Sequence, residues 1–161
     1  MNIFFLSWKP ALCAKYHNNK HVVKMCIEYA QLLSTAHRVL DNSRLSKSYD
    51  RDLCRSTHVN HPCAIWVRES SANYLWLYDL FVELLKEYTF RYGKQHALTR
   101  LVKKLGKLPK NIQVGKRTRP ALAMPDQYKV SSVVTSYRLF YMGAKRHLAQ
   151  WKIRKQPTWY I

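Results

Sequence analysis

The chain has 161 residues, a length that fits one domain with a sizeable hydrophobic core. Its 28 Lys and Arg against 9 Asp and Glu give a formal net charge of +19, a surplus that repels itself in a compact fold and indicates a polyanionic partner. Because the basic residues are spread along the chain and no apolar run approaches the roughly 18 residues of a membrane span, nucleic acid is favoured over a membrane.

The first residues and the cysteines bear on the cellular compartment. Residues 2–8 are apolar but few, are not preceded by basic residues and continue directly into Lys9-Pro10, so we do not expect them to form a signal peptide. The cysteines lack the spacing of a secreted disulfide framework; they are Cys13, Cys26, Cys54 and Cys63. We therefore expect a cytoplasmic protein with reduced thiols.

The residue patterns predict an all-α fold: a single compact multi-helix domain, residues 1–161, with an N-terminal extended arm. Residues 1–6 form the arm, and helices follow at 11–17, behind Pro10, and at 20–40. Residues 41–57 are polar and predict a flexible basic loop. A helix at 62–69 opens with Pro62, and a long one at 72–92 begins after Ser70 or Ser71 and ends at Gly93.

The C-terminal part of the chain is expected to hold a basic helix at 96–105, a second flexible basic loop at 107–125 and a final helix at 128–151. The loop at 107–125 is too polar and too often broken by Pro and Gly to pack as a core element. It is a natural arm for phosphate contacts, although a solvated linker would have the same composition.

The most informative segment is the predicted helix at 20–40. Polar residues spaced by three and four form one stripe, which consists of His17, His21, Lys24, Glu28, Gln31, Thr35 and Arg38. Apolar residues cover most of the remaining circumference, among them Val23 and Ile27, so this helix is expected to be buried. Since unpaired buried charge is costly, the stripe must be paired internally or line a pocket. A solvated face is the alternative, but histidine and glutamate suit proton transfer better than solubility.

Cys54-x3-His58-x2-His61-x-Cys63 places four zinc-type ligands close together. Closed zinc sites usually take two pairs from separated segments, so we favour a buried cysteine and a histidine pair at a helix entrance. We therefore expect no metal and no cofactor.

Three motifs accompany this order of elements: the helix start Lys20-His21-Val22-Val23-Lys24, the block from Asn60-His61-Pro62 to Gly93-Lys94, and the terminal Pro-Thr-Trp-Tyr. Together, the order and the motifs resemble the phage-type pyrimidine-dimer DNA glycosylases. The resemblance implies a small basic all-α repair enzyme that flips a nucleotide out of the duplex and cleaves its glycosidic bond. In that family Arg-Glu-x-x-Arg opens the second helix, its glutamate serves catalysis, and the free N-terminal amine attacks the sugar.

Carried over, Lys20 and Lys24 keep the basic positions and His21 stands where the glutamate would be, so His21 becomes a candidate acid or base. Glu28, two turns further along, could substitute as the carboxylate. Asn2 is too large for efficient methionine removal, so the amine is expected on Met1. The predicted catalytic residues are therefore Met1, Asn2, His21 and Glu28.

The resemblance implies a monomer that acts on duplex DNA as a glycosylase and AP lyase, in the host cytoplasm if a phage encodes it. The expected DNA contacts are Lys20, Lys24, Arg38, His61, Arg68, Lys116, Arg117, Arg119 and Trp159. The alternatives are a non-catalytic DNA-binding protein on the same fold and a different nucleobase or nucleotide transferase. An enzyme is favoured if the polar candidates converge in one cavity; these are His17, His21, Glu28, Asn60, His61 and Arg68.

Overall fold

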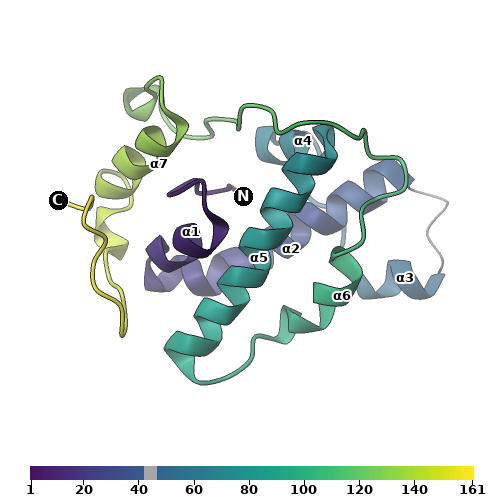
Figure 1. Cartoon of the computed structure of the whole chain (residues 1–161), viewed down its shortest axis with the longest axis horizontal. Coiled ribbons are helices and arrows are strands. Elements are labelled where there is room, and N and C mark those ends of the chain that lie inside the picture. Colours follow the sequence, from purple (N-terminus) through teal and green to yellow (C-terminus); the bar gives the residue numbers. More distant parts are fainter. Residues whose placement is uncertain (42–46) are drawn as a thin grey trace.

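All regular secondary structure is helical in this computed structural model, which describes residues 1–41 and 47–161 (Figure 1). The predicted all-α fold is confirmed. The α-helices are α1 (Pro10–Tyr16), α2 (Asn19–Asp41), α3 (Lys47–Asp52), α4 (Pro62–Glu69), α5 (Ser71–Tyr92), α6 (Val102–Leu105) and α7 (Val133–Met142). Short 3-10 turns occur at η2 (Ala97–Leu101), η3 (Asp126–Tyr128) and η4 (Arg146–Leu148).

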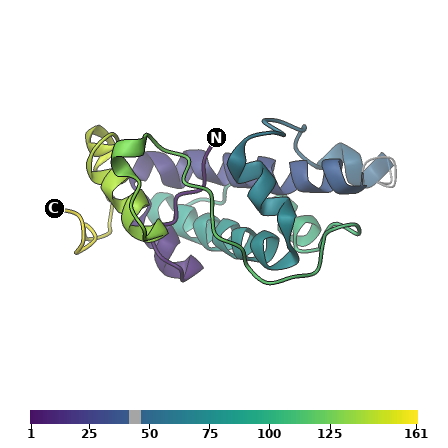
Figure 2. The same cartoon turned by 90° about the horizontal axis from the view of Figure 1, so that it is seen from above.

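The two longest helices, α2 and α5, pack against each other, both contact α4, and α5 also packs against α1 (Figure 2). Local signals fix the ends of α5. The Ser70 hydroxyl accepts a hydrogen bond from the Asn73 main-chain N–H at 3.2 Å, and Gly93 ends the helix at a φ of 67°, which favours glycine. The apolar residues of α2 and α5 then supply most of the core between them.

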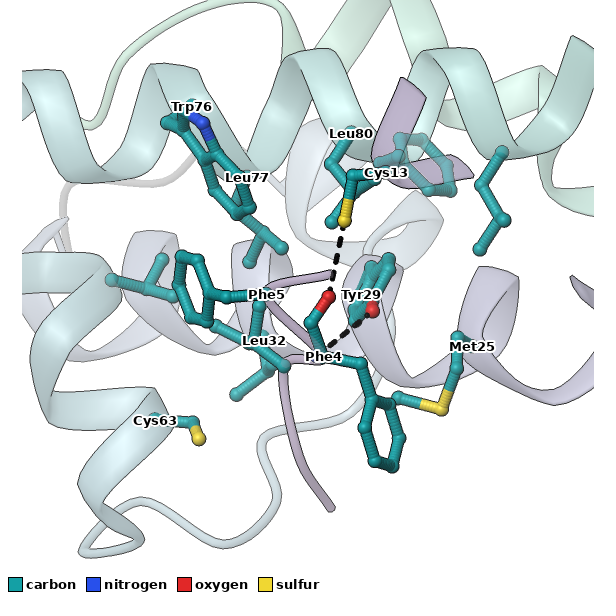
Figure 3. Packing of buried hydrophobic residues seen from close by; sticks show 14 of the residues in the cluster. Phe4, Phe5, Cys13, Met25, Tyr29, Leu32, Cys63, Trp76, Leu77 and Leu80 are labelled. Carbon is teal, nitrogen blue, oxygen red and sulfur yellow. Dashed lines mark hydrogen bonds between the residues drawn. The ribbon is translucent and has the colours of Figure 1, made fainter. Parts of the chain in front are cut away.

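The N-terminal arm lies inside the core rather than on the surface. Phe5 stacks on Trp76 with ring centroids 4.4 Å apart. The Phe4 main-chain N–H donates to the Tyr29 hydroxyl at 3.3 Å, and the Phe4 carbonyl accepts from the Cys13 thiol at 3.1 Å (Figure 3). An extended segment buried among helices needs such partners, because it has no neighbouring strand to pair with. These contacts fix the start of the chain relative to α1, α2 and α5.

The structure differs from three of the predicted elements. The expected loop at 41–57 contains helix α3; of that loop, residues 42–46 lie outside the described residues. The expected final helix at 128–151 is much shorter, since α7 begins after Ser132, whose hydroxyl caps it, and ends at Gly143. A Cβ at Gly143 would lie 2.5 Å from a ring carbon of Tyr128, so a tertiary contact sets this end. The expected helix at 96–105 is also divided, into η2 and α6.

The segment at 107–125 has no regular helix before η3, as expected, but it does pack against the core. Ile112 and Met124 are buried. The Asp41 carboxylate accepts hydrogen bonds from the main-chain N–H groups of Lys110 and Asn111, both at 3.0 Å. The prediction that this segment is too polar to pack was therefore wrong for its apolar residues, which sit between exposed basic ones.

Candidate active site

A pocket of about 170 Å³ opens beside the N-terminus. The arm, α2, the end of α7 and the turn after α7 line it with Met1, Asn2, Phe4, His21, Lys24, Met25, Glu28, Phe140 and Lys145. The four residues from α2 are spaced by three and four or lie next to one another, so a single helical face supplies them. All four predicted catalytic residues border this pocket.

A carboxylate lies against the N-terminal amine in this pocket. Glu28 Oε2 is 3.8 Å from the amine nitrogen of Met1 and accepts a hydrogen bond of 3.0 Å from the Asn2 main-chain N–H. The other oxygen, Oε1, lies 3.3 Å from Lys24 Nζ. The Glu28 side chain is 12% exposed, so this carboxylate is held by cations and an N–H group rather than by bulk water.

The arm runs along α2 in a way that explains this contact. Phe4 stacks on His21 with ring centroids 4.3 Å apart, and Met1 reaches Glu28. Three extended residues span about 10 Å, and seven helical residues also rise about 10 Å. The arm therefore runs antiparallel to α2 and brings its first residue to Glu28, two helical turns beyond His21.

Hydrogen bonds to Asn2 fix the start of the arm. Its amide nitrogen donates to the Ala123 carbonyl at 2.8 Å, and its amide oxygen accepts from the Tyr137 hydroxyl at 3.1 Å. The Met1 side chain is only 2% exposed and packs against the core. Because the residue as a whole is partly exposed, its main chain, which carries the amine, faces the solvent.

His21 is buried in the wall of the pocket. It stacks on Phe4, and its Nδ1 is hydrogen-bonded to the Tyr141 hydroxyl. Burial lowers the pKa of His21 to about 2, and the nearby positive charges of Lys145 and Lys24 act in the same direction. The imidazole is therefore neutral at pH 7. The position that the family motif gives to a glutamate holds an uncharged ring, and the carboxylate beside the amine is that of Glu28.

His17 packs against the His21 ring but does not line the pocket. It is fully buried, with Nδ1 hydrogen-bonded to the Cys13 carbonyl and Nε2 to the Tyr29 hydroxyl, both at 2.8 Å. Burial lowers the pKa of His17 to about 4. Its role in the fold is to join α1 to α2.

The far half of the polar stripe on α2 serves the fold. Thr35 exchanges hydrogen bonds with the main chain of Thr57, and Arg38 Nε donates to the Cys54 carbonyl at 2.8 Å. The stripe is thus divided into a pocket half and a half covered by the segment at 53–57. Val23 and Ile27, which the sequence placed on buried faces, are 39% and 44% exposed.

The polar candidates converge only in part. His21 and Glu28 line the pocket, whereas Asn60 is exposed. The His61 Nδ1 accepts a hydrogen bond from the Cys63 main-chain N–H and so caps α4. Burial lowers the pKa of His61, and the positive charge of the N-terminus lowers it further, so this ring lies within electrostatic range of the amine. Arg68 donates to the Val59 carbonyl at 2.7 Å and holds the preceding loop.

Most other predicted DNA contacts lie away from the pocket. Lys20 is exposed on the first turn of α2. Arg117 packs over the ring of Trp8, and Arg119 donates to the Ser131 carbonyl. Both arginines border a second hollow of about 440 Å³ at the other end of the N-terminal arm. Lys116 is exposed in the same segment, and Trp159 packs on the Arg138 guanidinium.

Two residues of the pocket were missed from the sequence. Phe140 comes from the last turn of α7 and Lys145 from the turn that follows this helix, and the Lys145 Nζ lies 5.1 Å from the centre of the Phe140 ring. Their separation by more than a hundred residues from His21, Lys24 and Glu28 leaves no local signal that could have pointed to them.

No group of three or more His, Cys, Asp or Glu residues within 1–41 and 47–161 is arranged to hold a metal ion. In the Cys54 to Cys63 cluster, His58 is exposed and hydrogen-bonded to Thr57, while Cys63 is buried. No helix in the described part of the chain is long and apolar enough to cross a membrane.

Comparison with known proteins gives one match. A family model described as pyrimidine dimer DNA glycosylase matches residues 1–100, which include the arm, α2, α4 and α5. No curated protein and no solved structure matches the chain. Residues 101–161, which supply Phe140 and Lys145 to the pocket, lie outside the matched region.

Proposed function

Because the chain belongs to the pyrimidine dimer DNA glycosylase family, whose membership implies DNA repair glycosylase activity on a DNA substrate, we propose that it excises a damaged pyrimidine and then cleaves the strand as an AP lyase. We assign the nucleophile to the amine of Met1 and the proton acceptor to Glu28. The observation that carries this assignment is the distance of 3.8 Å between the Met1 amine nitrogen and Glu28 Oε2.

The proposed chemistry uses these two groups in turn. The amine nitrogen attacks the C1′ carbon of the target deoxyribose, and the C1′–N bond breaks with its electron pair passing to the base. Glu28 accepts the proton that the attacking nitrogen loses. Glu28 then gives this proton to the ring oxygen O4′ as the C1′–O4′ bond breaks, which leaves a protonated imine between Met1 and C1′. The imine acidifies the hydrogen on C2′. Glu28, again a carboxylate, takes that proton, and a C2′–C3′ double bond forms as the C3′–O bond to the 3′ phosphate breaks.

The cations at the rim would hold the strained DNA backbone while the nucleotide is out of the stack. The Lys24 side chain is 69% exposed, and Lys145 is partly exposed on the opposite side of the pocket. Both can therefore contact phosphate oxygens that flank a nucleotide entering between them. Lys20 extends the same basic edge along α2.

Borohydride trapping tests the proposal, because it reduces an imine to a stable covalent link. With ultraviolet-irradiated duplex as substrate, the wild-type protein should become attached to DNA. Glu28→Gln should lower turnover by about 100-fold or more, the usual loss for a general base. Glu83→Gln is the matched control, since Glu83 pairs with Lys86 on α5 and does not line the pocket.

Mass spectrometry of the trapped peptide identifies the attacking amine. We expect the adduct on Met1. An adduct on Lys24 or Lys145, which also carry amines into the pocket, would contradict that assignment. A protein that binds duplex DNA but is never trapped, on any damaged or modified substrate, would instead support the non-catalytic alternative.

A further inference from the structure

The His21 ring is held by two contacts of different kinds. Phe4 stacks on its face, with an angle of 23° between the rings, and the Tyr141 hydroxyl meets its Nδ1 edge. The His21 main-chain N–H also donates to the Asn18 side chain at 2.9 Å. A histidine that only filled space would not need its ring orientation set from two sides.

The hydrogen-bond pattern fixes which ring nitrogen carries the proton. Among the described residues, His21 Nδ1 is the only hydrogen-bond partner of the Tyr141 hydroxyl, and burial raises the pKa of Tyr141 well above its usual value, so the hydroxyl keeps its own proton. That proton points to His21 Nδ1. Since the imidazole is neutral, its single proton must lie on Nε2.

Nε2 is the nitrogen left for a ligand. Among the residues that the structure describes, none is hydrogen-bonded to it, and the ring borders the same pocket as Glu28 and Lys24. The pocket therefore presents an uncharged N–H donor on one side and a carboxylate beside an amine on the other.

We propose that His21 donates a hydrogen bond from Nε2 to the O2 carbonyl oxygen of the pyrimidine that leaves, as a neutral donor and not as an acid. This inference rests on the proposed glycosylase function. When the C1′–N1 bond breaks, its electron pair passes to N1 and is shared with O2. A preorganised donor aimed at O2 stabilises that charge, and the His21 proton stays on Nε2 throughout.

Burial and the lysines near the ring make an imidazolium unfavourable in this place. Lys145 and Lys24 both oppose its protonation, and Glu28 is occupied by Lys24 and the N-terminal main chain. The proposed donor therefore needs no titration near neutral pH. An acid–base role would instead give a pH–rate limb that depends on His21.

Two substrates separate this role from a structural one. The first is a duplex with a pyrimidine dimer, where a base must leave; the second is the same duplex with a preformed abasic site, where none does. His21→Leu should slow excision about 100-fold, the typical loss of one such donor, while strand cleavage at the abasic site stays within about threefold of wild type. His21→Gln, whose amide N–H can reach the Nε2 position, should retain more excision activity than His21→Leu.

Tyr141→Phe tests how the tautomer is fixed. It keeps the ring packing but removes the hydroxyl, so we expect a loss of about tenfold in excision only, with Tyr88→Phe on the outer part of α5 as the matched control. Melting temperatures of all variants confirm that they fold.

The inference fails if His21→Leu excises dimers at the wild-type rate, or if it loses excision and abasic-site cleavage equally. It also fails if His21→Gln removes a pH–rate limb between pH 5 and 7. A wild-type protein that neither excises nor forms a trapped adduct on any duplex would instead overturn the proposed function itself.

Discussion

The main-chain N–H of Asn2 donates a hydrogen bond of 3.0 Å to Glu28 Oε2, the same oxygen that lies 3.8 Å from the Met1 amine. One carboxylate oxygen thus faces two successive main-chain nitrogens. If Met1 were removed, the new amine on Asn2 would already lie at Glu28. The proposed chemistry therefore depends on where along the arm the amine lies.

Extension of the N-terminus should abolish catalysis while DNA binding survives. One Gly added before Met1 moves the amine away from Glu28 by about 3.5 Å, and a misplacement of this size costs about 100-fold or more in rate. Trapping yield and excision rate are the measurements, with duplex affinity as the control. Unchanged trapping in the extended protein would mean that a lysine, not the N-terminus, attacks the sugar.

Binding to duplex DNA should weaken steeply with salt. A chain with a net charge of +19 binds largely by displacing counterions, so log K should fall with log salt with a slope that corresponds to about 4 to 8 phosphates. Lys24→Gln and Lys145→Gln should each reduce that slope by about one. A flat response, followed by fluorescence anisotropy, would argue against a nucleic-acid partner.

The basic segment at the second hollow should contribute affinity without specificity. Replacement of Lys116, Arg117 and Arg119 together by Gln should weaken binding to damaged and undamaged duplexes alike. Because none of the three lines the pocket, the excision rate at saturating DNA should stay within about threefold of wild type. A selective loss for damaged DNA would place the lesion near this segment instead.

A buried charge network should dominate the stability of the C-terminal tail. Glu87 is hydrogen-bonded to Arg91 at 2.7 Å and to Arg154 at 2.8 and 2.9 Å, and Arg91 is 1% exposed. Glu87→Gln leaves the buried Arg91 without its counter-charge and should lower the free energy of unfolding by about 3 to 5 kcal/mol in urea titrations. The exposed Glu83–Lys86 pair is the control. Glu83→Gln should change the free energy of unfolding by less than about 0.5 kcal/mol.

Acid should destabilise the protein below pH 6.5, because the buried histidines resist protonation. The pKa of His17 falls from 6.5 to about 4 through burial, so the unfolded chain binds a proton in this window that the folded chain does not. Stability is thus complete above pH 6.5 and declines as the pH falls toward 4, by up to about 1.4 kcal/mol per pH unit for each such histidine. His17→Gln should reduce the proton uptake on unfolding at pH 5 by about one; an unchanged uptake would contradict the assignment.

The sequence was sufficient for elements whose ends are fixed locally. The helix at 62–69 and the long helix up to Tyr92 were predicted closely because Pro62, Ser70 and Gly93 set their ends through neighbouring backbone groups. The end of α7 was wrong because it depends on the contact between Gly143 and Tyr128, which only the folded chain brings together.

The sequence predicted several residues that line the pocket but not their arrangement. The polar stripe located His21, Lys24 and Glu28 on one helix face. Which of them meets the amine depends on the path of the arm, and the motif comparison placed His21 in the glutamate position. Sequence spacing holds no information on how far an extended segment runs along a helix that it packs against, nor on the approach of Lys145.

The burial of the arm ties the reactive group to the completion of folding. Phe4 and Phe5 can occupy their places only when α1, α2 and α5 have closed around them, and Asn2 is fixed only when Tyr137 of α7 has docked. In a nascent or partly unfolded chain the same amine is an ordinary one, remote from any carboxylate. The proposed nucleophile therefore comes to lie beside its carboxylate only when the arm has been buried in the folded chain.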